Sequence, residues 1–531
     1  MIAMKSYYSH LSSRKEFGEK SDHIQKPVLR SSAVFPVMKN ENFSTRINFL
    51  GYWLIKRNIL EVHLLITLRK QSGDIILRKS ETISSVQAFS ITLNDLLNEL
   101  QIPSDENFIG SIETEFFTTR DMVFPYPALV LEYYNDDFNT CVHTLGRIYN
   151  DFEDLHDNEQ TIVPETGFDI YSNDDLTSFL SFVNGPILNE NGKIDYTITN
   201  SNSEKFSGTF ELNEIKPFET KLVFLKDHIP DLTKILKNTS GSISLKHNFE
   251  GFYPRLLVGN IQKSFPSVSF THSYYDCSSC VSDSDFWNRL DENFYDSSVY
   301  FPLFLNENHY TDLVIYPNFS PSEYDLHLEI YSSSGEKLFE DPTFYKIKSE
   351  ESELKKIKFK DLIKKIDLPE NQISSARIIT KFHEKKIPTR IKFGLNVGIS
   401  KVKSKLPCNI CFNSNLGNPN KENKPGSFHW SPMFRNGTCI ISLANFSNNK
   451  NYSKSANISL NFYHQNDSDF ISRTIYLKPY EEHRICLEND PELKEFFKTD
   501  GWVTATADNP HIQGFYFTFH PSGSVSGDHF F

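Results

Sequence analysis

The chain has 531 residues, three to four times the usual size of about 150 residues for one domain, so several domains are expected. Its net charge of −13 excludes a nucleic-acid binder that relies on a broad basic surface. A mean hydropathy of −0.43 and a 14% aromatic content exclude a membrane-embedded or disordered chain. The aromatic residues are numerous enough to fill several hydrophobic cores.

The first segment, residues 1–27, is predicted to be an N-terminal tail. It has no apolar run long enough for the core of a signal peptide, and no later stretch reaches the roughly 18 apolar residues of a spanning helix. The 7 cysteines are few and odd in number, which suits a reducing compartment. We therefore expect a cytoplasmic protein of bacterial type, with no membrane insertion and no nucleic-acid partner.

A fourfold internal repeat follows the tail. Each copy has alternating apolar strands, an acidic residue, a brief helical segment and another strand. The aligned acids are separated by 132, 134 and 129 residues; they are Asp95, Asp227, Asp361 and Asp490. Period-two alternation with polar turns is typical of antiparallel hairpins. The sequence therefore predicts an all-β chain of four tandem antiparallel β-sandwich domains of about 130 residues each, with short helical turns. Their expected bounds are 28–150, 160–278, 283–402 and 405–531.

Three of the aligned acids stand where an edge strand gives way to a helical turn, which predicts a helix N-cap role for Asp95, Asp361 and Asp490. A catalytic role is disfavoured, because four equivalent carboxylates in four separate modules do not converge on one substrate.

Histidines recur at the ends of the predicted closing strands. They are His143, His272 and His529; the third copy has Ser400 or its neighbours where a histidine would fall. A hydrogen bond that closes the last hairpin is the favoured explanation. The alternative is a ligand pocket, formed with Asp276 and Asp528 if the modules assemble into an array, because imidazole binds ligands or exchanges protons near neutral pH.

Two Cys-x-x-Cys pairs offer weak metal candidates. They are Cys277 with Cys280 and Cys408 with Cys411, and 127 residues lie between the pairs. Zinc ribbons place such pairs about 15–20 residues apart, so reduced thiols without a function are favoured and no metal or other cofactor is expected.

Common catalytic motifs are missing: there is no GxSxG, GxxxxGK[ST], GxGxxG after a strand or HExxH. Most aromatic rings are expected in the cores. Phe428 and Trp430 follow a Gly- and Lys-rich stretch and are the preferred exposed rings for stacking on a sugar.

Parts of the repeat resemble the small β-sandwich of the sensory rhodopsin transducer family. The similar stretches are Ile357 to Leu362, Val503 to Phe517 and Val142 to Arg147. The resemblance implies a soluble, cytosolic β-sandwich that acts by binding small molecules, sugars or protein partners. The third copy departs from the pattern because it lacks the terminal histidine, and no rhodopsin partner is inferred.

We therefore expect a non-enzymatic binding or scaffold protein that recognises a carbohydrate, a glycan precursor or a protein partner. One alternative is an enzyme of surface-polysaccharide or carbohydrate metabolism with an inter-domain site. A second is a structural protein that forms a homo-oligomer.

Overall fold

The computed structural model describes residues 27–143, 145–148, 165–249, 252–253, 255–272, 274–275, 286–288, 295–306, 308–317, 320–349, 353–384, 386–388, 391–417, 419–465 and 468–531. They form two compact units. The first comprises Met1–Asn135 and Cys141–Tyr275, and the second comprises Asp136–Thr140 and Asp276–Phe531.

One strand order recurs four times along the chain. Eight consecutive main strands form one sheet in the order first-sixth-third-fourth and another in the order fifth-second-seventh-eighth, with antiparallel neighbours. Four copies of one topology confirm the all-β, fourfold repeat. The four domain boundaries stay predictions.

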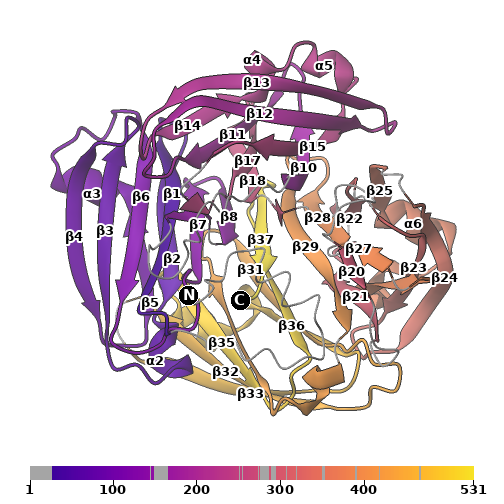
Figure 1. Cartoon of the computed structure of the whole chain (residues 1–531). Helices are drawn as coiled ribbons and strands as arrows, with labels where there is room; N and C mark the ends of the chain where they lie inside the picture. Colours follow the sequence, from indigo (N-terminus) through magenta and orange to yellow (C-terminus); the bar gives the residue numbers. More distant parts are fainter. Residues whose placement is uncertain are drawn as a thin grey trace. The chain divides into compact units, whose positions relative to one another are not determined.

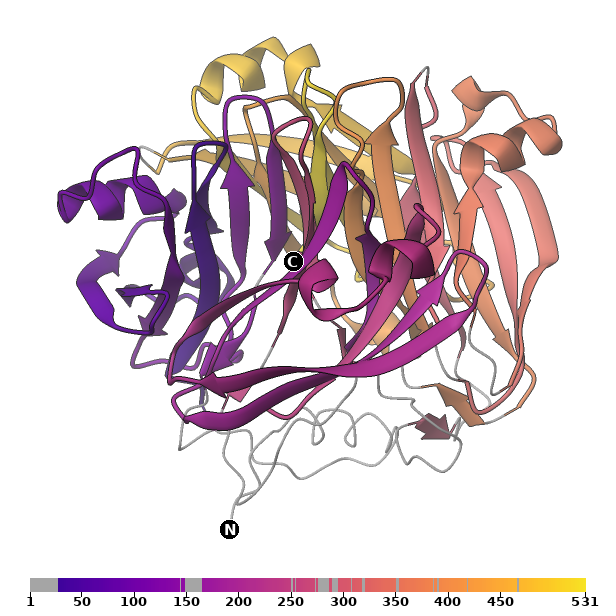
Figure 2. The same ribbon diagram turned by 90° about the horizontal axis from the view of Figure 1, so that it is seen from above.

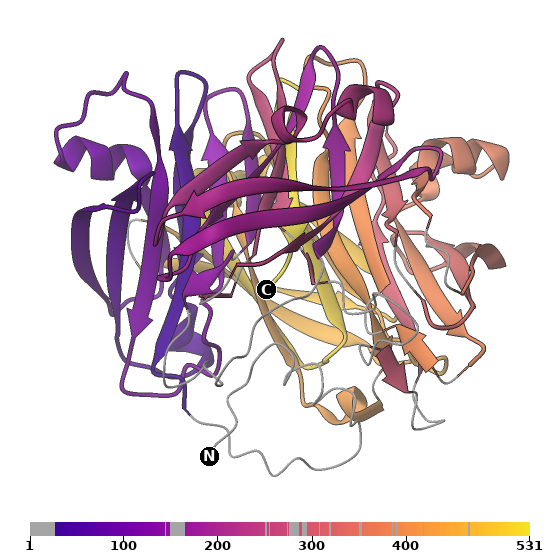
Figure 3. The same cartoon turned by 45° about the horizontal axis from the view of Figure 1, so that its top comes forward.

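The first unit holds two of these strand sets (Figure 1). The first set consists of β1 (Arg30–Lys39), β2 (Ser44–Leu50), β3 (Val62–Lys70), β4 (Ile75–Ile83), β5 (Ala88–Thr92), β6 (Phe108–Phe117), β7 (Leu129–Tyr134) and β8 (Asn139–His143), with helices α2 (Tyr52–Lys56) and α3 (Leu93–Glu99). The second consists of β10 (Glu165–Tyr171), β11 (Leu176–Val183), β12 (Asn189–Asn200), β13 (Lys205–Ile215), β14 (Thr220–Phe224), β15 (Ser240–His247), β17 (Leu257–Gln262) and β18 (Ser267–His272), with α4 (Leu225–His228) and α5 (Leu232–Ile235). Short strands β9 (Arg147–Ile148) and β16 (Phe252–Tyr253) pair with each other, and β19 (Tyr274–Tyr275) extends the β10 sheet. The long hairpin of β12 and β13 is plain in Figure 3.

The second unit holds the other two sets. The third set consists of β21 (Tyr295–Pro302), β22 (His309–Ile315), β23 (Tyr324–Tyr331), β24 (Lys337–Ile347), β25 (Lys355–Lys358), β26 (Ser375–Phe382), β28 (Ile391–Ile399) and β29 (Cys408–Gly417), with α6 (Phe359–Lys365) and the 3-10 turn η1 (Glu370–Gln372). The fourth consists of β30 (Ser427–Met433), β31 (Thr438–Asn445), β32 (Ala456–His464), β33 (Phe470–Leu477), β34 (Glu482–Cys486), β35 (Gly501–Ala507), β36 (Ile512–Phe519) and β37 (Val525–His529), with η2 (Pro419–Asn423), η3 (Leu487–Asn489) and α7 (Pro491–Phe496). Two short strands, β20 (Phe286–Asn288) and β27 (Lys386–Pro388), pair with each other.

Strand β29 closes the third set. It pairs along its length with β28 and joins β21, so that the two sheets of this set run together into one of eight strands. The third closing strand therefore ends at Gly417 rather than near Ser400, because residues 400–407 form a connection before it.

The second unit has one core that continues from the third set into the fourth. The ring of Phe304, after β21, packs edge-on against Phe517 and Phe519 of β36, with centroids 4.9 and 5.0 Å away. Both strand sets contribute buried residues to this cluster, and a second cluster centres on the second set of the first unit and includes Val34 of β1. Apolar residues alternate with polar ones along these strands, so each sheet has one apolar face. Two sheets pack against each other because this removes both apolar faces from water.

The aligned acids do not all cap helices. Asp490 is the N-cap of α7, and its Oδ1 accepts a hydrogen bond from the backbone N–H of Leu493 at 3.1 Å. The N-cap prediction is wrong for Asp95 and Asp361, which lie inside the first turns of α3 and α6. There a carboxylate interacts favourably with the positive end of the helix dipole. In each unit these short helices follow the fifth strand of a set (Figure 2).

Candidate functional site

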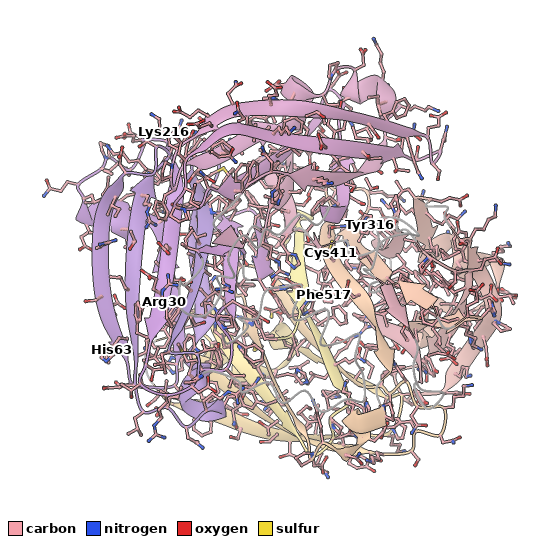
Figure 4. The ribbon with its side chains drawn as sticks, viewed as in Figure 1. Arg30, His63, Lys216, Tyr316, Cys411 and Phe517 are labelled. Carbon is pink, nitrogen blue, oxygen red and sulfur yellow. The ribbon has the colours of Figure 1, made fainter. Side chains whose placement is uncertain are left out.

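A four-residue loop of the same sequence type precedes the fifth strand of the second and fourth sets. It reads Lys216-Pro217-Phe218-Glu219 before β14 and Lys478-Pro479-Tyr480-Glu481 before β34. The two loops have the same hydrogen bonds, because each glutamate carboxylate accepts from the N–H of the lysine three residues before it, at 2.8 and 2.7 Å. Figure 4 labels Lys216 at the first of these loops. Phe218 and Tyr480 both have a positive φ, of 58° and 67°, which is uncommon for an aromatic residue.

Each loop meets the turn between the third and fourth strands of the preceding set. In the first unit, the N–H of Thr220 donates to the carbonyl of Gln71 at 2.9 Å, and in the second the N–H of Glu482 donates to the carbonyl of Ser333 at 3.0 Å. Corresponding residues in the two units are 262 residues apart. The two-set unit is therefore itself repeated.

Glycine permits this close approach. Gly73 and Gly335 lie in the two turns with φ of 92° and 82°, a region that L side chains rarely adopt. A Cβ at Gly335 would lie 2.8 Å from the carbonyl oxygen of Pro479. We call the region where loop and turn meet the junction of each unit.

The two junctions differ in charge. Thr220 and Glu482 are both buried, but the second unit places a carboxylate where the first has a hydroxyl. Two residues further on, Arg484 stands where the first unit has Leu222. The Nε of Arg484 donates to Oε1 of Glu482 at 2.8 Å, and its guanidinium lies over the ring of Phe304 at 4.5 Å.

Glu482 is fully satisfied by its neighbours. Besides Arg484, its Oε1 accepts from the hydroxyl of Ser442 at 2.6 Å, and its Oε2 accepts from the hydroxyl of Ser374. Burial alone would lower the pKa of Arg484, but Glu482 holds it above its usual value. Arg484 therefore keeps its positive charge, with a carboxylate directly beside it.

Arg484 faces a cavity of about 480 Å³ at the junction of the second unit. Buried residues form its floor and exposed polar residues its rim: Leu303, Asn306, Ser333, Ser334, Asn371, Gln372, Ile373, Ser374, Glu481, Glu482, His483 and Arg484. Its size falls within the range of about 300–1,000 Å³ for small-molecule sites, but its lining is unusually polar. It suits a ligand with many hydroxyl groups.

Several polar groups of this cavity have no partner among the described residues. Nη2 of Arg484 bonds to the carbonyls of Ser374 at 2.6 Å and Leu303 at 3.1 Å, whereas Nη1 makes no hydrogen bond to any described residue. The same holds for the side-chain amides of Asn371 and Gln372. These donors and acceptors are available to a ligand.

The predicted histidines meet within the first unit. His143 and His272 end β8 and β18, and their Nε2 atoms are 3.2 Å apart, with the rings edge to face. Nη2 of Arg255 lies 3.0 Å from Nε2 of His272. Because the guanidinium can only donate, Nε2 of His272 accepts, and the proton between the rings is on His143. Both rings are buried, so this arrangement suits a structural contact.

The other described residues of the predicted histidine pocket, Asp528 and His529, belong to the second unit. His529 ends β37, and its Nδ1 lies 2.9 Å from the carbonyl oxygen of Phe530. Asp528 is buried and accepts from the N–H of His529 at 2.8 Å. Asp276 lies outside the described residues. The common ligand pocket therefore stays a prediction.

Two of the predicted cysteines lie on β29. Cys408 and Cys411 are both buried, and Figure 4 shows Cys411 among packed side chains. They are three residues apart on a strand, so their side chains point to opposite faces. Burial raises the pKa of the Cys408 thiol, so it keeps its proton. These two sulfurs are therefore not placed to share one metal ion; Cys277 and Cys280 lie outside the described residues.

The aromatic pair of β30 is not an exposed platform. Trp430 is only 4% exposed and stacks on Phe531 at 5.7 Å, while Phe428 is half-buried with its ring 5.5 Å from that of Trp430. The prediction of an exposed set is wrong for Trp430, because alternate residues of this strand face the same packed layer. A ligand role for Phe428 stays a prediction.

Sequence reasoning missed the junction. Its signal was the Lys-Pro-aromatic-Glu quartet repeated after 262 residues, with Thr-Lys-Leu following one copy and Glu-His-Arg following the other. The second unit departs from the repeat here, because Glu482 and Arg484 are charged whereas the equivalent Thr220 and Leu222 are neutral.

Comparisons with known proteins do not assign the chain to a family. No family model and no curated protein match it. One similar solved structure is a tetra-tandem repeat in the extending region of a large adhesion protein, at 8% identity over 88% of this chain and 90% of that chain, with a TM-score of 0.09. So low a TM-score carries no argument. The resemblance to sensory rhodopsin transducers stays a hypothesis. In the described part of the chain, no helix has the length and apolar character to cross a bilayer.

Proposed function

We propose that this chain is a non-enzymatic binding protein whose second unit holds a neutral, hydroxyl-rich ligand, such as a saccharide or glycan precursor, in the cavity beside Arg484. The observation that carries the proposal is the buried Glu482–Arg484 pair facing that cavity, 2.8 Å apart. The first unit has Thr220 and Leu222 at these positions and forms the same backbone contact between loop and turn, so the fold does not need these charges.

The charge of the cavity selects the class of ligand. Arg484 is neutralised by Glu482, and the remaining ionised group of the lining is Glu481, so an anionic ligand gains no net attraction. Amide, hydroxyl, imidazole and guanidinium groups around the rim match the alternating donors and acceptors of sugar hydroxyls. The proposal includes a cytoplasmic location, which the free thiols of Cys141, Cys408, Cys411, Cys439 and Cys486 support.

The alternative function is an enzyme acting on carbohydrate at the same cavity. A glycosidase needs two carboxylates on either side of the scissile bond. Here both oxygens of Glu482 are engaged by Arg484 and by the hydroxyls of Ser374 and Ser442, so this carboxylate is not free to accept a proton. This arrangement favours binding.

The test is a titration of the full-length protein with neutral and acidic saccharides, followed by isothermal calorimetry. We expect a Kd of about 1 mM or tighter for at least one neutral sugar, about −4 kcal/mol. The matched variant is Glu482→Thr with Arg484→Leu, which copies Thr220 and Leu222 and should abolish binding. Equal binding by this variant, or no binding of any neutral sugar, would contradict the proposal. Mass spectrometry of the recovered sugar would detect turnover and so establish the enzyme alternative, while light scattering would reveal a homo-oligomer.

A further inference from the structure

A histidine and two glutamates lie together on one face of the β23–β24 hairpin, outside the lining of the junction cavity. His327 and Glu329 are two residues apart on β23 and so share a face, and Glu340 of β24 is the direct cross-strand partner of Glu329. One ligand atom of each of the three residues lies within 4.8 Å of the others. Nitrogen and carboxylate oxygen are ligands that Zn²⁺ accepts.

The cross-strand pair of glutamates is peculiar to the third set. The corresponding pairs are Thr67–Arg78 in the first set, Thr197–Ser207 in the second and Asn461–Ser472 in the fourth. Like charges directly opposite each other destabilise a sheet unless a cation lies between them. The hairpin itself therefore does not require two carboxylates at this point.

Lys337 bridges the two glutamates in this structure, while the buried Arg377 lies 3.4 Å from Oε2 of Glu329 only. The Nζ of Lys337 bonds to Oε1 of Glu329 at 2.9 Å and to Oε2 of Glu340 at 2.7 Å. The lysine side chain is 40% exposed, so it can turn into solvent without breaking the core. Its departure would release one oxygen of each glutamate.

His327 points to a second cation. The residue is 3% exposed, and neither ring nitrogen has a hydrogen-bond partner of proper geometry among the described residues. Nevertheless its Nε2 lies 2.9 Å from Oε1 of Glu340. A nitrogen and an oxygen about 3 Å apart without hydrogen-bond alignment have the spacing of neighbouring ligands around an ion with bonds of about 2.0–2.2 Å.

We propose that His327, Glu329 and Glu340 form a site for a divalent transition-metal ion of the Zn²⁺ type, in competition with the ammonium group of Lys337. The imidazole nitrogen of His327 and the carboxylate oxygens of Glu329 and Glu340 are the donor atoms that such an ion binds. The proposal does not depend on the proposed saccharide function.

The test is calorimetric titration of the metal-stripped full-length protein with Zn²⁺. Lys337→Met removes the competing charge and should tighten Zn²⁺ binding by at least about tenfold. Adding Glu340→Gln to this variant should cancel the gain. The matched control is Lys346→Met, because Lys346 pairs with Glu323 at 2.6 Å from the same strand but lies beside no histidine of the site. This control should bind as the wild type does.

Zn²⁺ binding to other thiols or imidazoles is the same in the wild type and in the three variants. The differences in Zn²⁺ affinity between these proteins therefore decide the outcome. Unchanged affinity after Lys337→Met, or a gain that survives Glu340→Gln, would overturn the proposal. The melting temperature provides a second readout, because an ion that binds only the folded protein stabilises it. Zn²⁺ should raise the melting temperature of Lys337→Met more than that of Lys346→Met, and an equal rise would also overturn the proposal.

Discussion

Thr220 and Glu482 occupy equivalent positions in the two units, and each donates its backbone N–H to the turn of the preceding strand set, at 2.9 and 3.0 Å. Both side chains are buried. The backbone contact is therefore a property of the repeat, whereas the charge of Glu482 is a property of one copy. Comparison between the units separates what the fold needs from what the second junction adds.

Arg484 should be essential to stability only while Glu482 is present. Arg484→Leu leaves a fully buried carboxylate without its cation and should lower the free energy of unfolding by about 2–4 kcal/mol, less than for a pair with no solvent access. Glu482→Thr combined with Arg484→Leu should bring the stability back to within about 1 kcal/mol of the wild type. Urea unfolding followed by fluorescence measures both values. A double variant as unstable as the single one would contradict this interpretation of the pair.

The turn glycines should not tolerate a side chain. Gly335→Ala places a Cβ 2.8 Å from the carbonyl oxygen of Pro479 at a φ of 82°, and should cost about 1–3 kcal/mol. Gly73→Ala should act in the same direction in the first unit, where the equivalent distance to Pro217 is 2.3 Å. Thermal unfolding measures the loss. Ser334→Ala is the control, because this exposed neighbour should change the stability by no more than about 0.5 kcal/mol. Equal melting temperatures for all three variants would disprove the close approach.

His247 should make the stability depend on pH. Burial lowers its pKa to about 4, and its Nδ1 accepts a hydrogen bond from the N–H of Phe249 at 3.2 Å. Between the unfolded pKa of about 6.5 and this value, the unfolded chain binds a proton that the folded chain does not. Stability should therefore fall as the pH is lowered from 7 to 4, by about 3 kcal/mol from this residue alone.

The contribution of His247 can be separated from that of the carboxylates by substitution. His247→Gln keeps an acceptor for the N–H of Phe249 but does not titrate. Chemical unfolding at several pH values should give a shallower dependence for this variant than for the wild type. Identical slopes would show that the buried imidazole is not responsible.

The histidine contact in the first unit should be structural. His272→Phe keeps a ring but removes the acceptor for Arg255 and His143, and should cost about 1–3 kcal/mol. His143→Phe should destabilise less in a protein that already carries His272→Phe, because the two residues share one interaction. A thermodynamic cycle of the four proteins tests this coupling. Unchanged stability together with lost ligand binding would instead favour a ligand role.

The sequence predicted the repeat well because its signals are local. The alternation of apolar residues along a strand can be read from a few neighbouring positions, and so can the N-cap role of Asp490 between a strand and a helix. The same reasoning failed for Trp430, since a Gly- and Lys-rich stretch before a strand does not reveal what packs on it. It also failed for the closing strand of the third set, because residues 400–407 lengthen the connection and strand pairing is decided at long range.

The sequence by itself determined the class of fold, the number of copies and the termini of the histidine-bearing strands, because period-two burial and turn chemistry are encoded in adjacent residues. Only the tertiary structure brought Ser374 and Arg484 to one cavity, although 110 residues separate them. It also showed that Glu482 stands where the first unit has Thr220. Burial and cross-strand pairing bring such residues together, and neither is visible in the order of residues along the chain.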